Sequence, residues 1–161
     1  MYTVAILTIS DKGHAGLRED VSGATIATLV VDRGYSVAHR SILPDEQALI
    51  SNALIRLCNE RISLILTTGG TGFAERDVTP EATLAVVERL CPGIPEAMRA
   101  HSLTIAKKAM LSRAVAGIRG KSLIVNLPGS PKAVRECLDC VLDAIAHGLD
   151  ILTGRDGECA R

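Results

Sequence analysis

Apolar residues along the chain follow two spacings, one typical of strands and one typical of helices. Short runs rich in β-branched and aliphatic residues predict strands at residues 3–9, 35–43, 62–66, 114–118 and 122–127. Between most of these runs, apolar residues recur every three or four positions, the spacing of a helix with one buried face. This spacing predicts helices at residues 21–32, from 45 through 58, at 80–90, at 94–108 and from 131 onward.

The order of these segments, in which strands mostly alternate with helices, predicts an α/β fold. We expect a three-layer α/β/α sandwich with a mainly parallel sheet and helices on both of its faces. A short turn at residues 119–120 separates the last two predicted strands, so their hairpin should add an antiparallel strand at one side of the sheet. With 161 residues and no repeat or linker, the chain is expected to form one domain over residues 1–161, with a frayed tail at residues 154–161.

Charge and composition argue against several classes of partner. The 18 basic residues balance the 18 acidic residues, and only three residues are aromatic. Nucleic acids and anionic membranes select basic surfaces, and single-stranded nucleic acids also select aromatic platforms, so we expect neither partner. No apolar run approaches the ~20 residues of a membrane span. The start of the chain has no basic leader, and five cysteines, an odd number, favour the reducing cytoplasm over a disulfide framework.

The candidate chemistry is concentrated between a predicted strand and a predicted helix, at residues 67–81, which read TTGGTGFAERDVTPE. Glycines allow the backbone to approach a ligand, and free N–H groups beside a helix N-terminus attract anions such as phosphate. Thr79 and Pro80 are typical of an N-cap and a first helical residue. A plain glycine turn is the alternative. However, Asp77 precedes the helix, and Mg²⁺ binds through one or two carboxylates plus substrate phosphates, which favours a phosphate and metal site.

Three other loops carry polar residues directly after predicted strands. The first begins at Ser10, and the second contains Asp45, whose alternative role is that of a helix N-cap. The third, PGSPK at residues 128–132, places Lys132 in the first turn of a helix, where a lysine is favourable if an anion shares the site. Open α/β sheets bind ligands beyond the carboxyl ends of their strands. Four such loops therefore predict a site for a large phosphorylated ligand with a metal.

The motifs in these loops resemble the molybdopterin adenylyltransferase family of molybdenum-cofactor biosynthesis. This family includes a bacterial enzyme, a bacterial paralogue and the G domains of the plant enzyme and gephyrin. Residues 67–82 match the pattern TTGGTGxxxRDxTPEA without a gap, and LPDE at 43–46 and NLPGSPK at 126–132 match two further motifs. The first loop matches the pattern SDxxxxGxxEDxSG, so the resemblance extends over most of the chain.

The resemblance implies that the protein binds molybdopterin and Mg-ATP. The terminal phosphate of molybdopterin would attack the α-phosphate of ATP, giving adenylated molybdopterin and pyrophosphate. It also implies a homotrimer and possible hand-over to a molybdate-inserting enzyme. Asp45 and Asp77 would be catalytic and would hold or orient Mg²⁺. The residues implied to bind substrate or nucleotide are Ser10, Asp20, Ser22, Gly23, Thr68, Gly69, Gly70, Thr71, Gly72, Thr79, Pro80, Glu81, Glu96, Asn126, Gly129, Ser130 and Lys132.

Several alternatives stay open at this point. The protein could be a non-catalytic molybdopterin-binding or scaffold paralogue, although a binder need not keep both Asp45 and Asp77. It could also be a hydrolase that consumes nucleotide without a pterin. Glu96 could form only a solvated pair on its helix. Cys137 and Cys140 form a CxxC pair inside a predicted helix, with no second Cys/His pair at zinc spacing, so we interpret them as structural.

Overall fold

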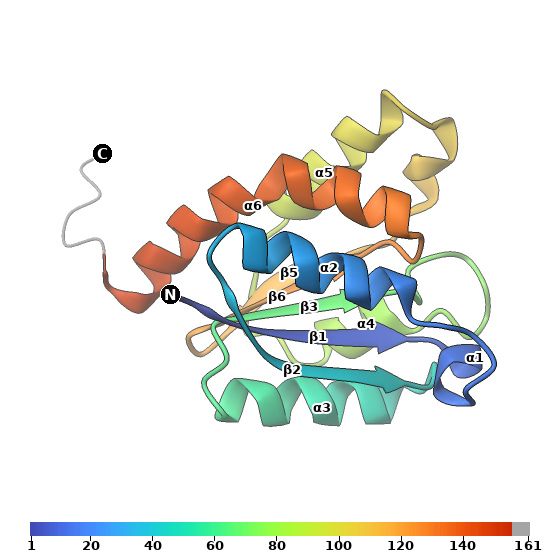
Figure 1. The fold of residues 1–161 in the computed structure, drawn as a ribbon, viewed down its shortest axis with the longest axis horizontal. Coiled ribbons are helices and arrows are strands. Elements are labelled where there is room, and N and C mark those ends of the chain that lie inside the picture. The colour runs from blue at the N-terminus through green and yellow to red at the C-terminus, as the bar shows by residue number, and fades with distance from the viewer. Residues whose placement is uncertain (156–161) are drawn as a thin grey trace.

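The three most continuous aliphatic runs of the chain form adjacent inner strands of a six-stranded sheet (Figure 1). The computed structural model describes residues 1–155, and the strand order is β2-β1-β3-β6-β5-β4. β2, β1, β3 and β6 are parallel, β5 pairs antiparallel with β6, and β4 pairs antiparallel with β5. The strands are β1 (Thr3–Ile9), β2 (Ser36–Leu43), β3 (Leu64–Thr68), β4 (Arg89–Leu90), β5 (Ala116–Arg119) and β6 (Ser122–Leu127). The mainly parallel sheet with an antiparallel hairpin strand is confirmed.

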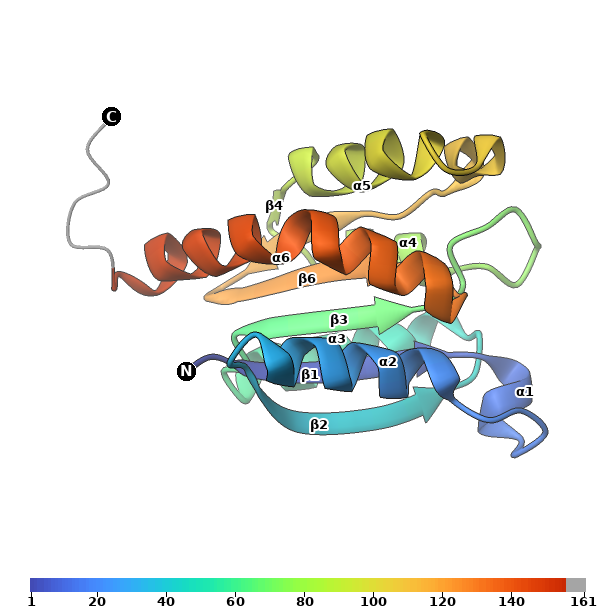
Figure 2. The ribbon, with the colours of Figure 1, turned by 45° about the horizontal axis from the view of Figure 1, so that its top comes forward.

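Helices cover both faces of this sheet, which confirms the three-layer sandwich (Figure 2). α2, α5 and α6 pack on one face, and α3 and α4 pack on the other. None of the described helices is long and apolar enough to cross a membrane. The helices are α1 (Asp11–His14), α2 (Val21–Asp32), α3 (Gln47–Asn59), α4 (Thr79–Leu84), α5 (Gly93–Leu103), the 3₁₀ helix η1 (Lys107–Leu111) and α6 (Pro131–Thr153).

Each inner parallel strand sends alternate side chains into two separate hydrophobic clusters. In β1, Val4 and Ile6 join the cluster with α2 and α6, whereas Ala5 and Leu7 join the cluster with α3 and α4. Because strand side chains alternate between faces, a strand buried on both sides reads as an unbroken aliphatic run. The sequence pattern therefore located β1, β3 and β6 to within two residues.

The helix predicted at residues 80–90 is wrong in its second half. α4 ends at Leu84, and Arg89–Leu90 form the edge strand β4. The backbone N–H groups that flank β4 donate to carbonyl oxygens of β5 at 2.8 and 2.9 Å. Gly117 of β5 permits this approach, because a Cβ atom there would lie 2.7 Å from the Val87 side chain. Pairing with the sheet therefore overrides the helical spacing of the apolar residues.

Two further segments differ from the prediction. The helix predicted at residues 94–108 ends at Leu103, and η1 follows it as a separate 3₁₀ turn. The loop after β1 begins with the one-turn helix α1, whose N-cap is Ser10: the Gly13 N–H donates to its hydroxyl oxygen at 3.0 Å. The predicted frayed tail lies outside the described residues from position 156 onward.

The four described cysteines are free thiols. Cys58 is half-buried and packs against the cluster under α3. Cys137 is buried in the cluster under α6, whereas Cys140, one turn later, is exposed. Burial raises the pKa of the Cys137 thiol, which keeps it protonated and unreactive at neutral pH.

Candidate functional site

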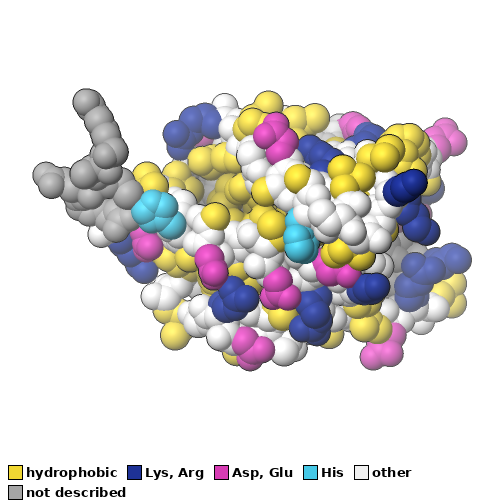
Figure 3. Space-filling view, turned by 90° about the horizontal axis from the view of Figure 1, so that it is seen from above, with side chains coloured by type: hydrophobic (Ala, Val, Ile, Leu, Met, Phe, Trp, Pro, Cys, Tyr) yellow, Lys and Arg dark blue, Asp and Glu magenta, His cyan; other side chains and the backbone are white. Residues whose placement is uncertain are grey.

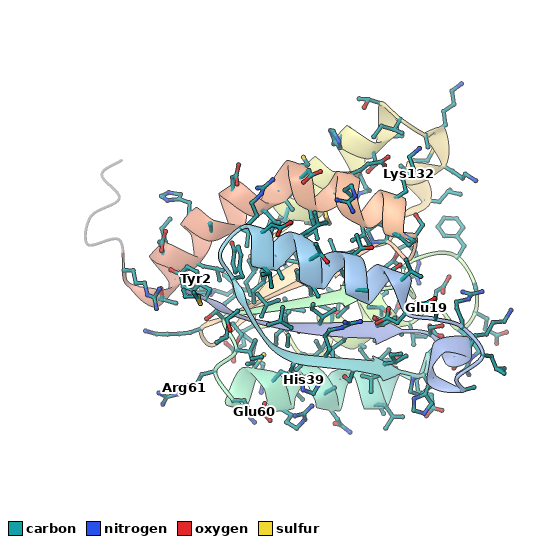
Figure 4. All side chains as sticks on the ribbon, in the orientation of Figure 1. Tyr2, Glu19, His39, Glu60, Arg61 and Lys132 are labelled. Carbon is teal, nitrogen blue, oxygen red and sulfur yellow. The ribbon has the colours of Figure 1, made fainter. Side chains whose placement is uncertain are left out.

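A cleft of about 630 Å³ opens beyond the carboxyl ends of the parallel strands. Its walls come from the loops that follow β1, β2, β3 and β6. Glu19 and Lys132 lie at this end of the molecule, whereas Glu60 and Arg61 lie at the opposite end (Figure 4). The cleft is lined by Thr8, Ile9, Ser10, Gly13, Arg18, Glu19, Asp20, Val21, Ser22, Asp45, Thr68, Gly69, Gly70, Asp77, Gly129, Ser130 and Pro131.

The glycine-rich loop, residues 69–78, follows β3 and forms one wall of this cleft. Gly69 and Gly70 have φ angles of 94° and 66°, a left-handed conformation that other residues adopt only at a cost. A Cβ atom at Gly69 would lie under 3.0 Å from the Ile9 carbonyl oxygen. Thr79 then fixes the loop, because its hydroxyl donates to the Gly69 carbonyl at 3.0 Å and its N–H donates to the Gly70 carbonyl at 3.1 Å. The two glycines therefore let the loop lie directly against the end of β1.

Asp77 ends the glycine-rich loop, and its carboxylate turns back into the loop. The Ala74 N–H donates to Asp77 Oδ2 at 2.9 Å. A Cβ atom at Gly72 would lie 2.8 Å from the same oxygen, so a glycine there makes room for the carboxylate. The N-cap of α4 is Val78, which corrects the expectation that Thr79 caps this helix. Asp77 is therefore not a helix cap, and it lines the cleft.

Asp45 comes from the loop after β2 and is bound to the first loop through a reciprocal pair of hydrogen bonds. The Asp11 N–H donates to Asp45 Oδ2 at 2.9 Å, and the Asp45 N–H donates to Asp11 Oδ1 at 3.0 Å. The N-cap position of α3 is Glu46, so Asp45 does not cap that helix. Burial raises the pKa of Asp45, and the negative charges of Asp11 and Asp77 raise it further. A cation beside Asp45 would relieve this repulsion.

An ion pair joins the glycine-rich loop to the loop after β1. The Arg76 guanidinium donates to both carboxylate oxygens of Asp11, at 2.6 and 2.9 Å. These two bonds and the Asp45 N–H lower the pKa of Asp11. Both side chains are substantially exposed, 58% for Arg76 and 42% for Asp11, so water screens the attraction between them. The pair nevertheless connects the loop that carries Asp77 to Asp11, which in turn accepts the Asp45 N–H.

The opposite wall is built around Asp20 at the start of α2. The Asp20 carboxylate accepts from the Thr8 hydroxyl at 2.9 Å and from the Gly23 N–H at 2.8 Å, and it pairs with Arg40 at 3.1 Å. The Ser22 hydroxyl donates to the carbonyl oxygen of Gly129 at 2.7 Å. These contacts hold the α2 N-terminus against the loop after β6, and this wall is fixed before any ligand arrives.

The N-terminus of α6 also reaches the cleft. Ser130 caps this 23-residue helix by accepting from the Ala133 N–H at 3.2 Å, and both Ser130 and Pro131 line the cleft. A helix N-terminus carries partial positive charge and attracts anions. Lys132 projects from the same turn with its side chain 81% exposed, and its ammonium group lies 3.9 Å from Glu136.

A family model described as "Probable molybdopterin binding domain" matches residues 5–147. The chain belongs to this molybdopterin-binding domain family. The molybdopterin adenylyltransferase of Helicobacter pylori strain J99 is 45% identical over 154 residues, which cover 94% of this chain and 88% of that protein. The molybdopterin adenylyltransferase of Escherichia coli K12 is 42% identical over 154 residues, covering 91% of this chain and 78% of that protein.

Solved structures agree with this assignment to the molybdopterin-binding domain family. The molybdopterin biosynthesis enzyme MoaB from Thermus thermophilus has a TM-score of 0.91 at 46% identity, covering 96% of this chain and 98% of that one. The tungsten cofactor synthesizing protein MoaB from Pyrococcus furiosus has a TM-score of 0.85 at 31% identity, covering 94% of this chain and 96% of that one. The fold of the whole sheet and its helices is therefore shared.

Some residues predicted for the site lie outside the cleft of this molybdopterin-binding domain. The side chain of Asn126 is buried, where it bonds the Thr67 and Thr83 hydroxyls and the Val115 N–H. Glu96 is exposed on α5 and lines no described cavity. The buried residues Gly23, Thr79 and Pro80, and the partly buried Glu81, do not line the cleft either.

A second cavity of about 460 Å³, with mainly apolar walls, lies between α5, η1 and the start of α6. Thr71, Gly72 and Lys132, which the sequence predicts as ligand-binding residues, line this second cavity instead of the cleft. Ser130 lines both cavities, so the two spaces adjoin at the N-terminus of α6.

Sequence reasoning missed two residues that organise this molybdopterin-binding domain. Asp11 is the acceptor that links Arg76 to the Asp45 backbone. Asp11 and Arg76 carry opposite charges and both lie in loops that follow strands, so their ion pair could have been predicted from the sequence. Arg113 bonds the glycine-rich loop, but it is 36 positions from Asp77 and follows η1, so no local pattern signalled this contact.

Proposed function

We propose that this protein is a molybdopterin adenylyltransferase. The observation that carries the proposal is the pair of carboxylates, Asp45 and Asp77, beside the glycine-rich loop in one cleft. Relatives that bear this name are 42% and 45% identical over most of the chain, which supports it. In the reaction, a terminal phosphate oxygen of molybdopterin forms a bond to the α-phosphorus of ATP. The bond from that phosphorus to the bridging oxygen breaks, and pyrophosphate leaves with that oxygen.

The two carboxylates fit a magnesium ion. Each uses Oδ2 to accept a backbone N–H, and Oδ1 of each accepts no hydrogen bond from the described residues. A Cβ atom at Gly70 would lie 3.2 Å from Asp45 Oδ1, so the glycine leaves space in front of that oxygen. Mg²⁺ held by Asp45 and Asp77 would neutralise phosphate charge as it develops.

The chain's own groups bind and orient the anionic parts of the substrates. The Gly70 N–H in the cleft has no acceptor within the described part of the chain, so it is available to a phosphate oxygen. The N–H groups of Thr71 and Gly72, which line the adjoining cavity, have no acceptor there either. The N-terminus of α6 at Ser130 adds partial positive charge to the cleft, and Lys132 in its first turn adds positive charge to the adjoining cavity. Phosphoryl transfer depends mainly on positioning and electrostatic stabilisation, and this arrangement is suited to both.

The experiment that tests this proposal uses purified protein with molybdopterin and Mg-ATP, followed by mass spectrometry of the products. We expect adenylated molybdopterin and an equal amount of pyrophosphate. Without molybdopterin, ATP should stay intact, because a hydrolase would consume it unaided. Binding of molybdopterin without adenylated product would refute transferase activity and favour a non-catalytic binding protein.

We also infer a homotrimer, which would cover an exposed apolar surface on α5 and the segment after it. Leu103, Ile105, Met110 and Leu111 are each at least 41% exposed. Figure 3 looks down on this side of the molecule and shows apolar side chains gathered in its upper part, with charged side chains around them. Contiguous exposed apolar patches mark interaction sites. Light scattering that gives a monomer mass across micromolar concentrations would refute the trimer.

We place this activity in the cytoplasm, because a reducing compartment keeps cysteines such as the buried Cys137 and the exposed Cys140 as thiols. The adenylated product would then be passed to an enzyme that inserts molybdate. A fusion of the chain to a fluorescent protein, imaged in its host, tests the location.

A further inference from the structure

One arginine outside the cleft bonds the glycine-rich loop at several points. The Arg113 N–H donates to the Thr71 carbonyl oxygen at 2.9 Å. The Arg113 guanidinium donates to the Gly72 carbonyl oxygen at 2.7 Å and to the Asp77 carbonyl oxygen at 2.5 Å. Its remaining terminal nitrogen donates to the Glu81 carboxylate in the first turns of α4. A single residue therefore joins the start of the loop, its end and the helix that follows.

Arg113 ties the tip of the loop to the start of the loop, whereas the Arg76–Asp11 pair ties the tip to the loop after β1. Among the bonds described within the loop, the Asp77 N–H donates to the Ala74 carbonyl at 2.9 Å, and the Ala74 N–H donates to the Asp77 carboxylate at 2.9 Å. Both bonds stay within one small turn, and neither ties that turn to Gly72. Arg113 makes that tie, because one guanidinium holds the carbonyl oxygens of Gly72 and Asp77 together.

The geometry requires an arginine. A guanidinium presents five N–H donors in a rigid planar fork, so it can bond three acceptors in fixed directions. A lysine ammonium is a point charge on a flexible stem, and it cannot reproduce this set. Glu81 fixes the orientation of the fork, and Arg113 in turn lowers the pKa of Glu81, which keeps that carboxylate ionised.

We propose that Arg113 is a positioning residue that sets the place of Asp77 in the cleft. Arg113 lines neither cavity, so it acts through the loop and not on a substrate. The inference rests on the proposed adenylyl transfer, because it assigns Asp77 a role in that reaction. Loss of an outer partner that orients a ligand of a metal typically costs about 10–100-fold in activity.

The first test compares Arg113→Lys with Arg119→Lys. Arg119 is a matched control, because its guanidinium also donates to a backbone carbonyl, that of Val86 at 3.0 Å, but it lies in β5 away from the loop. We expect Arg113→Lys to lower kcat by about 10–100-fold with little change in KM, since it misplaces a group that acts on the transition state. Arg119→Lys should keep the wild-type kcat.

A second variant separates positioning from general stability. In Arg113→Ala, millimolar guanidinium should restore part of the lost kcat by occupying the vacated space between the carbonyl oxygens. A protein that was only destabilised would show no rescue, because millimolar guanidinium has a negligible effect on the free energy of unfolding. If Arg113→Ala does not fold, Arg113→Lys alone decides the question.

A readout independent of activity is amide hydrogen exchange followed by mass spectrometry. In Arg113→Lys, exchange should accelerate at residues 70–78 and stay unchanged in β6. Wild-type kcat or wild-type loop exchange in Arg113→Lys would overturn the positioning role. If the wild type makes no adenylated molybdopterin, the proposed function fails, whereas unchanged loop exchange in the variant overturns the positioning inference by itself.

Discussion

Replacing Asp77 with asparagine removes one negative charge from the cleft and leaves the shape of the loop in place. Asparagine has the same size as aspartate, and its side-chain oxygen can still accept the Ala74 N–H that now reaches Asp77 Oδ2 at 2.9 Å. The Asp77 carbonyl oxygen, which Arg113 bonds, is unaffected by the substitution. The variant therefore tests the charge of Asp77 apart from its structural contacts.

The expected losses in stability and activity differ enough to be separated. Exchanging a charged acceptor for a neutral one weakens this hydrogen bond by about 1 kcal/mol. A domain stable by about 5 kcal/mol or more stays more than about 99% folded after such a loss. Removing a preorganised electrostatic contact lowers turnover by about 10²–10³-fold, or roughly 3–4 kcal/mol. Unfolding therefore cannot account for the loss of adenylyl transfer that we expect.

The assay measures molybdopterin affinity and turnover of Asp77→Asn side by side. Affinity should stay close to that of the wild type, while turnover falls by the factor above. Glu75→Gln is the matched control, because it removes the same charge from an exposed position two residues away in the same loop. Turnover at the wild-type level in Asp77→Asn, or an equal loss in Glu75→Gln, would show that Asp77 has no specific electrostatic role.

Asp45→Asn should lower turnover in the same way, because Asp45 and Asp77 are proposed to hold one ion. In the double variant, the loss of transition-state free energy should be smaller than the sum of the two single losses, because both residues would act through the same ion. If the two losses add fully, the residues do not share an ion. Gly69→Ala should destabilise the fold by about 2 kcal/mol or more, since the left-handed φ and the close backbone carbonyl both oppose a Cβ atom. Gly148→Ala, at an open helical position, should be neutral or stabilising in the same urea titration. The Arg76 guanidinium lowers the pKa of the Asp11 carboxyl below its usual 3.8. The ionised carboxylate therefore stabilises the fold above pH 3.8, and this stabilisation is lost as the pH falls through the lowered pKa. The difference in melting temperature between Asp11→Asn and the wild type should thus be constant from about pH 5 to 7 and shrink below about pH 4, and a constant difference at all pH values would refute this. Replacing Cys137 and Cys140 together with alanine should cost about 1 kcal/mol and keep turnover, and stoichiometric zinc in the purified protein would contradict a structural role.

Local sequence determined much of the fold and the location of the cleft. The aliphatic runs at β1, β3 and β6 identify strands buried on both faces, because only such strands lack polar alternation. The glycines at positions 69 and 70 indicated a loop whose backbone can approach a ligand closely. In the structure both have left-handed φ angles, and Gly69 lies against the Ile9 carbonyl. The placement of polar loops after strands predicted one shared cleft, since parallel strands end at the same edge of the sheet.

Only the tertiary structure decided which loop residues line the cleft and which hold the loops in place. β4 exists because its backbone pairs with β5 at a glycine, and no local apolar pattern marks a two-residue edge strand. Asn126 lies within a motif, yet its buried side chain bonds the Thr67 and Thr83 hydroxyls and the Val115 N–H and does not line the cleft. Asp11 meets Asp45 across 34 positions, and Arg113 meets Asp77 across 36. The sequence by itself places each charged residue within its own loop, helix or strand. Which group that residue bonds depends on how distant segments pack, because hydrogen bonds form only over short distances in space.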